Sequence, residues 1–111
     1  MNKRKPVGVT FADVRRVALS LPNVEEGTSY GTPAFKTKGK LFVRERPDLE
    51  SIVVRTSAEE RDEMMAADPE TYFITDHYLN YPWVLARLSK VHPDVLHDLL
   101  EGARRHAASP K

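Results

Sequence analysis

The sequence predicts an α+β fold: a compact two-layer domain with helices on one face of a largely antiparallel sheet, in the order α-β-β-β-α-β-β-α. Three observations lead to this prediction. Helix-type apolar periodicity occurs near both ends and in the middle of the chain, and strand-like segments fill the intervals. Short turns join most of these segments, and short turns connect antiparallel neighbours.

The first helix should begin after Thr10, a suitable N-cap. Asp13 lies in the first turn, where its side chain can return a hydrogen bond to the cap residue. Apolar residues then recur at three- and four-residue spacing and form one stripe: Phe11, Val14, Val17, Ala18 and Leu21. The pair Pro22-Asn23 should end this helix.

Residues 28–56 have a strand-like period. The segment "KTKGKLFVRER" predicts a hairpin with Lys38-Gly39 at its tip, and "SIVVRT" predicts a third strand after the turn "PDLES". In the expected register Phe35 lies opposite Phe42. One face would then carry Lys40, Phe42, Arg44 and Arg46, and the other would carry Leu41 and Val43. A slip of one residue would exchange the faces.

The second half begins with a capping-box pattern at Ser57 and Glu60, followed by a helix to about Ala67. The segment "TYFIT" predicts a strand, "DHYLNYP" a turn and "WVLARLSKV" another strand. Pro93 suits the first turn of a last helix, because a helix needs no amide hydrogen there.

The length and the amino-acid composition of the chain limit the class of protein. A chain of 111 residues with 41% apolar and 30% charged residues makes one globular domain. We expect residues 1–9 to form a flexible basic N-terminal tail and residues 10–108 to form the domain. The absence of cysteine excludes disulfides and fits a reducing compartment. Neither a signal-peptide pattern nor an apolar run of about 20 residues is present, so we expect a cytoplasmic protein with no membrane partner.

Charge is distributed unevenly although the net charge is only +1. Residues 36–46 carry five basic residues and one acid, whereas residues 57–70 carry six acids and one basic residue. A basic hairpin with Phe35 and Phe42 beside it could follow phosphates and stack on bases. The alternative is a solvated hairpin whose phenylalanines belong to the core. The candidate nucleic-acid-binding residues are Lys36, Lys38, Lys40, Arg44 and Arg46.

Aromatic residues are concentrated in one segment: residues 72–83 hold five of the nine. Trp83 and one of Tyr72 and Phe73 are expected to anchor this segment to the core. The residues of the turn could instead form a ligand or partner surface together with an earlier tyrosine. The residues of this alternative surface are Tyr30, Asp76, His77, Tyr78 and Tyr81.

Catalytic chemistry finds little support in the sequence. Asp76 and His77 could form a carboxylate–imidazole pair, but neighbours in an extended segment point apart and no further ligand lies at a recognisable spacing. Ser29 lacks the G-x-S-x-G elbow, and no phosphate-binding glycine loop is present. We therefore expect no catalytic residues, no metal site and no cofactor, and a domain that is not an enzyme.

Two long segments resemble the MmcQ/YjbR family: "ALSLPNVEEGTSYGTPAFKTKGKLFVR" and "SAEERDEMMAADPETYFITDHYLNYPWVLARLSKVHPDVLHDLLEGARR". The resemblance covers about residues 10–105. It implies a CyaY-like α+β fold with a double-wing arrangement of hairpins and a DNA-binding role, and it supplies no catalytic residues. The two wings would be the hairpin around Lys38-Gly39 and the turn at 76–81.

The function expected is thus that of a small non-enzymatic DNA-binding domain that uses the basic hairpin. The alternative is a module that binds a small ligand or a protein partner through the aromatic turn 72–83. The sequence leaves open whether the hairpin and the aromatic turn share one face, and it does not predict the oligomeric state.

Overall fold

The computed structural model describes residues 7–109. In chain order the elements are α1 (Phe11–Ser20), β1 (Val24–Ser29), β2 (Thr32–Thr37), β3 (Lys40–Glu45), β4 (Ser51–Arg55), α2 (Ala58–Ala67), β5 (Tyr72–Phe73), the 3₁₀ turn η1 (Asp76–Tyr78), β6 (Trp83–Arg87), the 3₁₀ turn η2 (Leu88–Lys90) and α3 (Pro93–Ala108).

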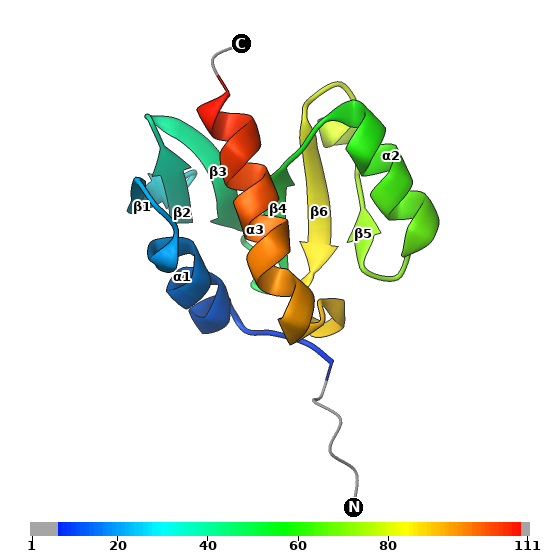
Figure 1. Cartoon of the computed structure of the whole chain (residues 1–111). Coiled ribbons are helices and arrows are strands. Elements are labelled where there is room, and N and C mark those ends of the chain that lie inside the picture. Colours follow the sequence, from blue (N-terminus) through cyan, green and yellow to red (C-terminus); the bar gives the residue numbers. More distant parts are fainter. Residues whose placement is uncertain (1–6, 110–111) are drawn as a thin grey trace, which may run out of the picture.

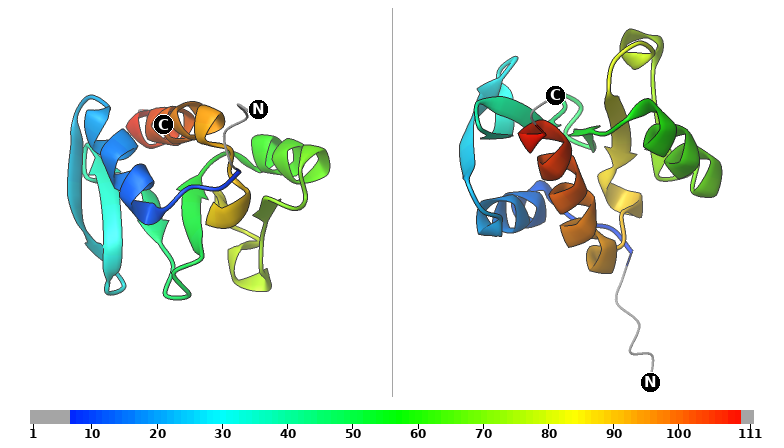
Figure 2. Two further views of the ribbon diagram at one scale, coloured as in Figure 1. Left: turned by 90° about the horizontal axis from the view of Figure 1, so that it is seen from below. Right: turned by 45° about the horizontal axis from the view of Figure 1, so that its top comes forward.

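The six strands form one sheet in the order β1-β2-β3-β4-β6-β5, and every neighbouring pair is antiparallel. Helix α3 runs across the middle of the sheet, with α1 beside it and α2 over the β5–β6 side (Figure 1). Seen from below, all three helices lie on the same side of the sheet (Figure 2, left). The predicted two-layer α+β architecture is confirmed, and the opposite face of the sheet, the helix-free face, carries no helix longer than the turn η1 in the described part of the chain.

One strand, β1, adds to the predicted order. Its sequence "VEEGTS" has few strand-favouring residues, and its central residues are exposed, so its periodicity is weak. It is held as the outer strand by a tight turn in which both Tyr30 and Gly31 have positive φ angles, of 55° and 82°. On the helix side, Glu26 also forms an ion pair with Arg15 of α1 at 2.9 Å.

The β2–β3 hairpin confirms the predicted tip and corrects the predicted register. Lys38 and Gly39 form the turn, with φ angles of 53° and 78°. A bulge shifts the pairing, so that Phe35 lies opposite Val43 and not opposite Phe42. The extra residue in β3 turns Phe42 and Val43 toward the helices, where both are fully buried. Regular alternation, which the sequence prediction assumed, puts Phe42 on the wrong face.

Two apolar clusters stabilise the domain. The larger lies between the sheet and the helices and includes Phe35, Phe42 and Leu100. The smaller lies on the helix-free face, where Tyr78 packs on Val53 and Leu85 with Phe73, Ile74 and Trp83 around them. The β5–β6 connection thus folds back over the sheet, as expected for a loop anchored by aromatic residues.

The predicted basic tail, residues 1–9, lies mostly outside the described residues. Within them, the amides of Gly8 and Val9 donate hydrogen bonds to the carbonyl oxygens of Val91 (2.9 Å) and Leu88 (2.8 Å), so the packed domain includes these two residues. Thr10 and Asp13 form the reciprocal cap predicted for α1. None of the helices within residues 7–109 has the length and apolar character needed to cross a bilayer.

Candidate functional site

The helix-free face carries three arginines, each placed over an aromatic ring. The guanidinium carbon lies 5.2 Å from the ring centroid for Arg44 over Tyr30, 4.6 Å for Arg55 over Trp83 and 4.1 Å for Arg87 over Phe73. Strand pairing puts the arginines and two of the rings, those of Trp83 and Phe73, on this face, and Tyr30 reaches it from the β1–β2 turn. Arg44 pairs with Val53, Arg55 with Trp83 and Phe73 with Leu85, and directly paired residues share a face.

Among the described residues, none of these three arginines forms an ion pair with a carboxylate. Within residues 7–109, the ion pairs formed by arginine involve other positions, namely Arg15, Arg16, Arg46, Arg61, Arg104 and Arg105. Arg55 instead donates to the carbonyl oxygen of Leu41 at 2.7 Å, and Arg87 donates to the carbonyl oxygen of Glu70 at 2.8 Å. Burial lowers the pKa of Arg55 below its ordinary value, but a guanidinium remains charged in proteins. The face therefore offers positive charge supported on aromatic rings.

Arg44 lies at a cavity of about 380 Å³ between the β1–β2 turn and the β5–β6 connection. Its Nη2 donates to the Oη of Tyr78 at 2.9 Å, which holds the guanidinium beside the Tyr30 ring. Leu41, Val53 and Trp83 contribute apolar surface to the same cavity. Tyr30 and Tyr81 also line it and are 87% and 57% exposed.

Arg61 of α2 fixes the backbone of the β5–β6 connection. Its Nη1 donates to the carbonyl oxygens of Tyr81 (2.9 Å) and Tyr78 (3.2 Å), and its Nη2 donates to that of Leu79 (3.3 Å). Arg61 is only 7% exposed. This one side chain ties α2 to three carbonyl groups of the connection. Two of them, those of Tyr78 and Tyr81, also accept hydrogen bonds from the amides of Tyr81 and Trp83.

The five basic residues predicted to bind nucleic acid do not form a single cluster. Lys36 pairs with Leu41, so it shares the helix-free face with Arg44. Lys38 and Lys40 are exposed at the hairpin tip. Arg46 is engaged at the opposite end of β3, where its Nη1 contacts Asp48 at 3.3 Å and the Ser51 hydroxyl at 3.1 Å.

The residues of the alternative surface come together around the cavity, with one exception. Tyr30, His77, Tyr78 and Tyr81 all line it. The His77 ring meets Tyr78 edge-on, with centroids 4.9 Å apart. Asp76 is exposed and does not line the cavity, and no described hydrogen bond joins it to His77. Within the described residues, no group of three or more His, Cys, Asp or Glu side chains could hold a metal ion.

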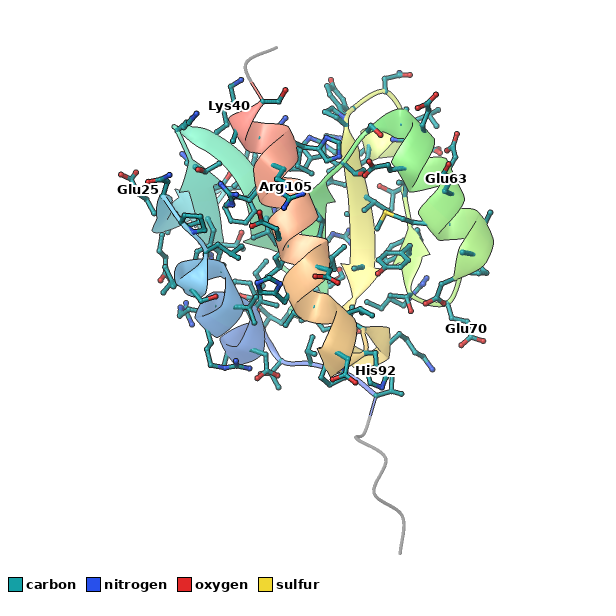
Figure 3. All side chains as sticks on the ribbon, viewed as in Figure 1. Glu25, Lys40, Glu63, Glu70, His92 and Arg105 are labelled. Atoms are coloured by element: carbon teal, nitrogen blue, oxygen red, sulfur yellow. The ribbon has the colours of Figure 1, made fainter. Side chains whose placement is uncertain are left out.

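The hairpin tip and η1 lie at the same end of the sheet (Figure 1). Lys40 projects from this end beside the hairpin, whereas Glu63 and Glu70 project on the far side of the molecule, around α2 (Figure 3). Lys40, Arg55 and Pro82 also line one groove, together with His106 and Ser109 at the end of α3. The hairpin and the aromatic turn therefore share one end of the molecule, and Arg44 joins them on the helix-free face.

Sequence reasoning missed Arg55, Arg61 and Arg87. Arg55 and Arg87 each end a largely apolar strand, "SIVVR" and "WVLAR". A lone arginine at that position could have marked both as candidate site residues. Arg61 is the only basic residue in the acidic helix, and this contrast could have marked it as a side chain with a buried partner. The identity of that partner, a set of backbone carbonyls, has no sequence signature.

Fold and site together define a small α+β module whose open sheet face combines arginines with aromatic rings. The YjbR family model matches residues 19–106, so the chain belongs to the YjbR family. This confirms the family resemblance seen in the sequence.

A solved structure supports the fold independently. The crystal structure of Deinococcus radiodurans protein DR2400, which is described with the domain DUF419, superposes with a TM-score of 0.78 at 23% sequence identity. The match covers 96% of this chain and 83% of that one. At this identity the likeness establishes the shared fold. No curated protein matches the chain.

Proposed function

We propose that the chain binds single-stranded DNA across the helix-free face of its sheet. The observation that carries this proposal is the set of three arginines stacked on aromatic rings, none of them paired with a described carboxylate. Proteins that bind single strands combine cationic groups for the backbone with aromatic rings for the bases.

The contrast with Arg15 supports a role for these pairs beyond packing. Arg15 lies 5.4 Å from the Phe11 ring centroid on the helix side, and its charge is neutralised by Glu26 at 2.9 Å. The arginines of the helix-free face have the same ring contact without the acid. Their positive charge is available to phosphate oxygens, to which a guanidinium can donate two parallel hydrogen bonds.

The basic hairpin extends this surface in the proposal. Lys38 and Lys40 are exposed at its tip and add charge at the end of the sheet where η1 lies. A single strand is favoured over a duplex because its unstacked bases can reach Tyr30 and Tyr81, whereas the bases of a duplex are already stacked. The acidic residues of α2 repel phosphate and direct the strand away from that side.

Fluorescence anisotropy with a labelled oligothymidylate of about ten nucleotides tests the proposal. We expect binding at low salt that weakens as salt rises, with a log–log slope of about −0.7 per phosphate contact. Arg55→Gln and Arg87→Gln should each weaken binding, whereas Arg16→Gln on α1, whose side chain is 72% exposed, should not. Absence of binding at micromolar protein and low salt would overturn the proposal.

A second variant pair separates the face from the hairpin tip. If the face is the principal surface, Arg44→Gln weakens binding more than Lys38→Gln, because Arg44 is held beside aromatic rings and Lys38 projects freely from a turn. The reverse order would assign the principal contact to the basic hairpin.

The alternative function, a module for a small ligand, is favoured by one observation, the cavity of about 380 Å³ beside Arg44. Trp83 lines this cavity and is the only tryptophan, so its emission reports on occupancy directly. A ligand that binds there should change both Trp83 emission and the melting temperature.

A further inference from the structure

The cavity beside Arg44 has the make-up of a site for one nucleotide. Its volume of about 380 Å³ lies at the small end of the range of roughly 300–1,000 Å³ typical of ligand pockets. Its walls combine the aromatic rings of Tyr30, Tyr78, Tyr81 and Trp83 with a single arginine. Such a lining matches a ligand with one planar ring system and one anionic group.

The two exposed tyrosines come from connections near opposite edges of the sheet. Tyr30 belongs to the β1–β2 turn at one edge, and Tyr81 precedes β6, which lies next to the other edge. Both the β1–β2 turn and η1 project to the side away from the helices (Figure 2, left). A planar ring that enters the cavity can therefore contact a tyrosine from each rim.

Tyr30 is presented in a conformation that its side chain disfavours. Its φ angle is 55°, and the residue is 87% exposed. Bulky residues adopt positive φ rarely, and asparagine or glycine would serve a two-residue hairpin turn better. An exposed aromatic ring kept in a strained turn gains little from packing, and such strain is often found where a side chain contacts a ligand.

The Arg44 guanidinium is fixed by its neighbours in a position from which it can bind an anion. Tyr78 is 9% exposed, and its Oη accepts the hydrogen bond from Arg44 Nη2 at 2.9 Å. Arg61 in turn fixes the carbonyl oxygens of Tyr78 and Tyr81. The guanidinium of Arg44 keeps further N–H groups for a ligand, since it has five donors and the Tyr78 hydroxyl and the Glu45 carbonyl oxygen accept one each.

We propose that this cavity binds one nucleoside monophosphate unit, with its base stacked on Tyr30 or Tyr81 and its phosphate hydrogen-bonded to Arg44. This inference rests on the proposed function in taking DNA as the source of the nucleotide. It goes further by assigning one position of the bound strand, with an unstacked base, to a defined pocket. The remaining nucleotides then lie along the same face of the sheet, near Arg55 and Arg87.

The test is a titration of the full chain with deoxyadenosine monophosphate, deoxyadenosine and inorganic phosphate, each followed by Trp83 emission and by calorimetry. The monophosphate should bind, the nucleoside should bind on the order of tenfold more weakly because it loses the charged hydrogen bond, and phosphate alone should bind weakest. Equal affinity for monophosphate and nucleoside would overturn the role of Arg44. Phosphate binding as tightly as the monophosphate would overturn stacking.

Variants locate the site. Arg44→Gln and Tyr81→Ala should each lower the monophosphate affinity on the order of tenfold. Arg16→Gln is the matched control, because Arg16 lies on α1, away from the helix-free face, and its side chain is 72% exposed. Thermal melting of each variant separates lost binding from lost folding. Equal losses in Arg16→Gln and Arg44→Gln, or no loss in Arg44→Gln and Tyr81→Ala, would place the nucleotide outside the cavity and overturn the inference.

The two proposals fail in different ways. Single-stranded DNA binding without monophosphate binding at millimolar concentration would overturn the pocket and leave the proposed function standing. Monophosphate binding that depends on Arg44 and Tyr81, without binding of the oligonucleotide, would overturn the proposed function and leave a small-nucleotide site.

Discussion

Arg61 donates a hydrogen bond from Nη1 to the carbonyl oxygen of Tyr81 at 2.9 Å, so a helix on one face of the sheet fixes the turn that serves the other face. The same side chain reaches the carbonyls of Tyr78 and Leu79. Through these bonds α2 determines where the Tyr78 hydroxyl meets Arg44. The shape of the candidate site therefore depends on a residue that does not line it.

Replacement of Arg61 should lower the stability of the protein. Arg61→Met should lower the free energy of unfolding by about 2–4 kcal/mol, because it removes the charged hydrogen bonds that join α2 to three carbonyl oxygens of the connection. Urea unfolding measures the change, and Trp83 emission should shift to longer wavelength as the turn loosens. Arg16→Met, which removes an arginine whose side chain is 72% exposed, should change stability by less than about 0.5 kcal/mol. Equal stability of the two variants would show that Arg61 does not hold the turn.

The hairpin tip provides a second test of the fold. Gly39 has a φ angle of 78° and no neighbouring atom where a Cβ would lie, so Gly39→Ala should cost only backbone strain, about 1–2 kcal/mol. Gly27→Ala is the control, since a Cβ there also meets nothing and φ lies outside the left-handed region. Chemical denaturation compares the two. A Gly39→Ala variant as stable as Gly27→Ala would contradict the turn conformation.

Glu101 should make stability depend on pH. The hydrogen bonds from Arg104, and then those from Arg105, hold the pKa of its carboxyl at about 2, below the ordinary value of 4.5. A lowered pKa in the folded state means that Glu101 stabilises the protein above pH 4.5 and loses this contribution as pH falls toward 2.

The variant Glu101→Gln should therefore be less stable than the parent at neutral pH, by about 1 kcal/mol for a pair near the surface. Thermal melting across the acid range measures the difference, which should shrink between pH 4.5 and about 2. A difference that stays constant over this range would mean that the carboxylate charge does not contribute.

Much of the fold could be predicted from short-range signals. The cap formed by Thr10 and Asp13 and the turn at Lys38-Gly39 depend on residues close in sequence, and both are confirmed. The strand β1 and the bulge in β3 could not be predicted in this way. The edge strand is mostly exposed and has no alternation, and the bulge depends on pairing across strands that the sequence of one strand does not contain.

The sequence assigned the residues of the candidate site to two separate hypotheses. Arg44 was assigned to a basic hairpin and Tyr78 to an aromatic turn, and the contact between them, at 2.9 Å, joins the two hypotheses in one place. The residues are 34 positions apart, and only the fold of the β5–β6 connection over the sheet brings them together. Of the two interpretations of Phe35 and Phe42, the structure supports the one in which both belong to the core, because both rings are fully buried between the sheet and the helices.

The most direct test of the central claim is a map of backbone amide chemical shifts during titration with a single-stranded oligonucleotide of about ten nucleotides. We predict shifts concentrated in β3, β4 and β6 and in the β1–β2 and β5–β6 connections, with the Trp83 indole among the largest. The amides of α1 and α3, on the other face, should move little. Shifts centred on α1 and α3, or no shifts at all, would contradict the assignment of the helix-free face as the DNA-binding surface.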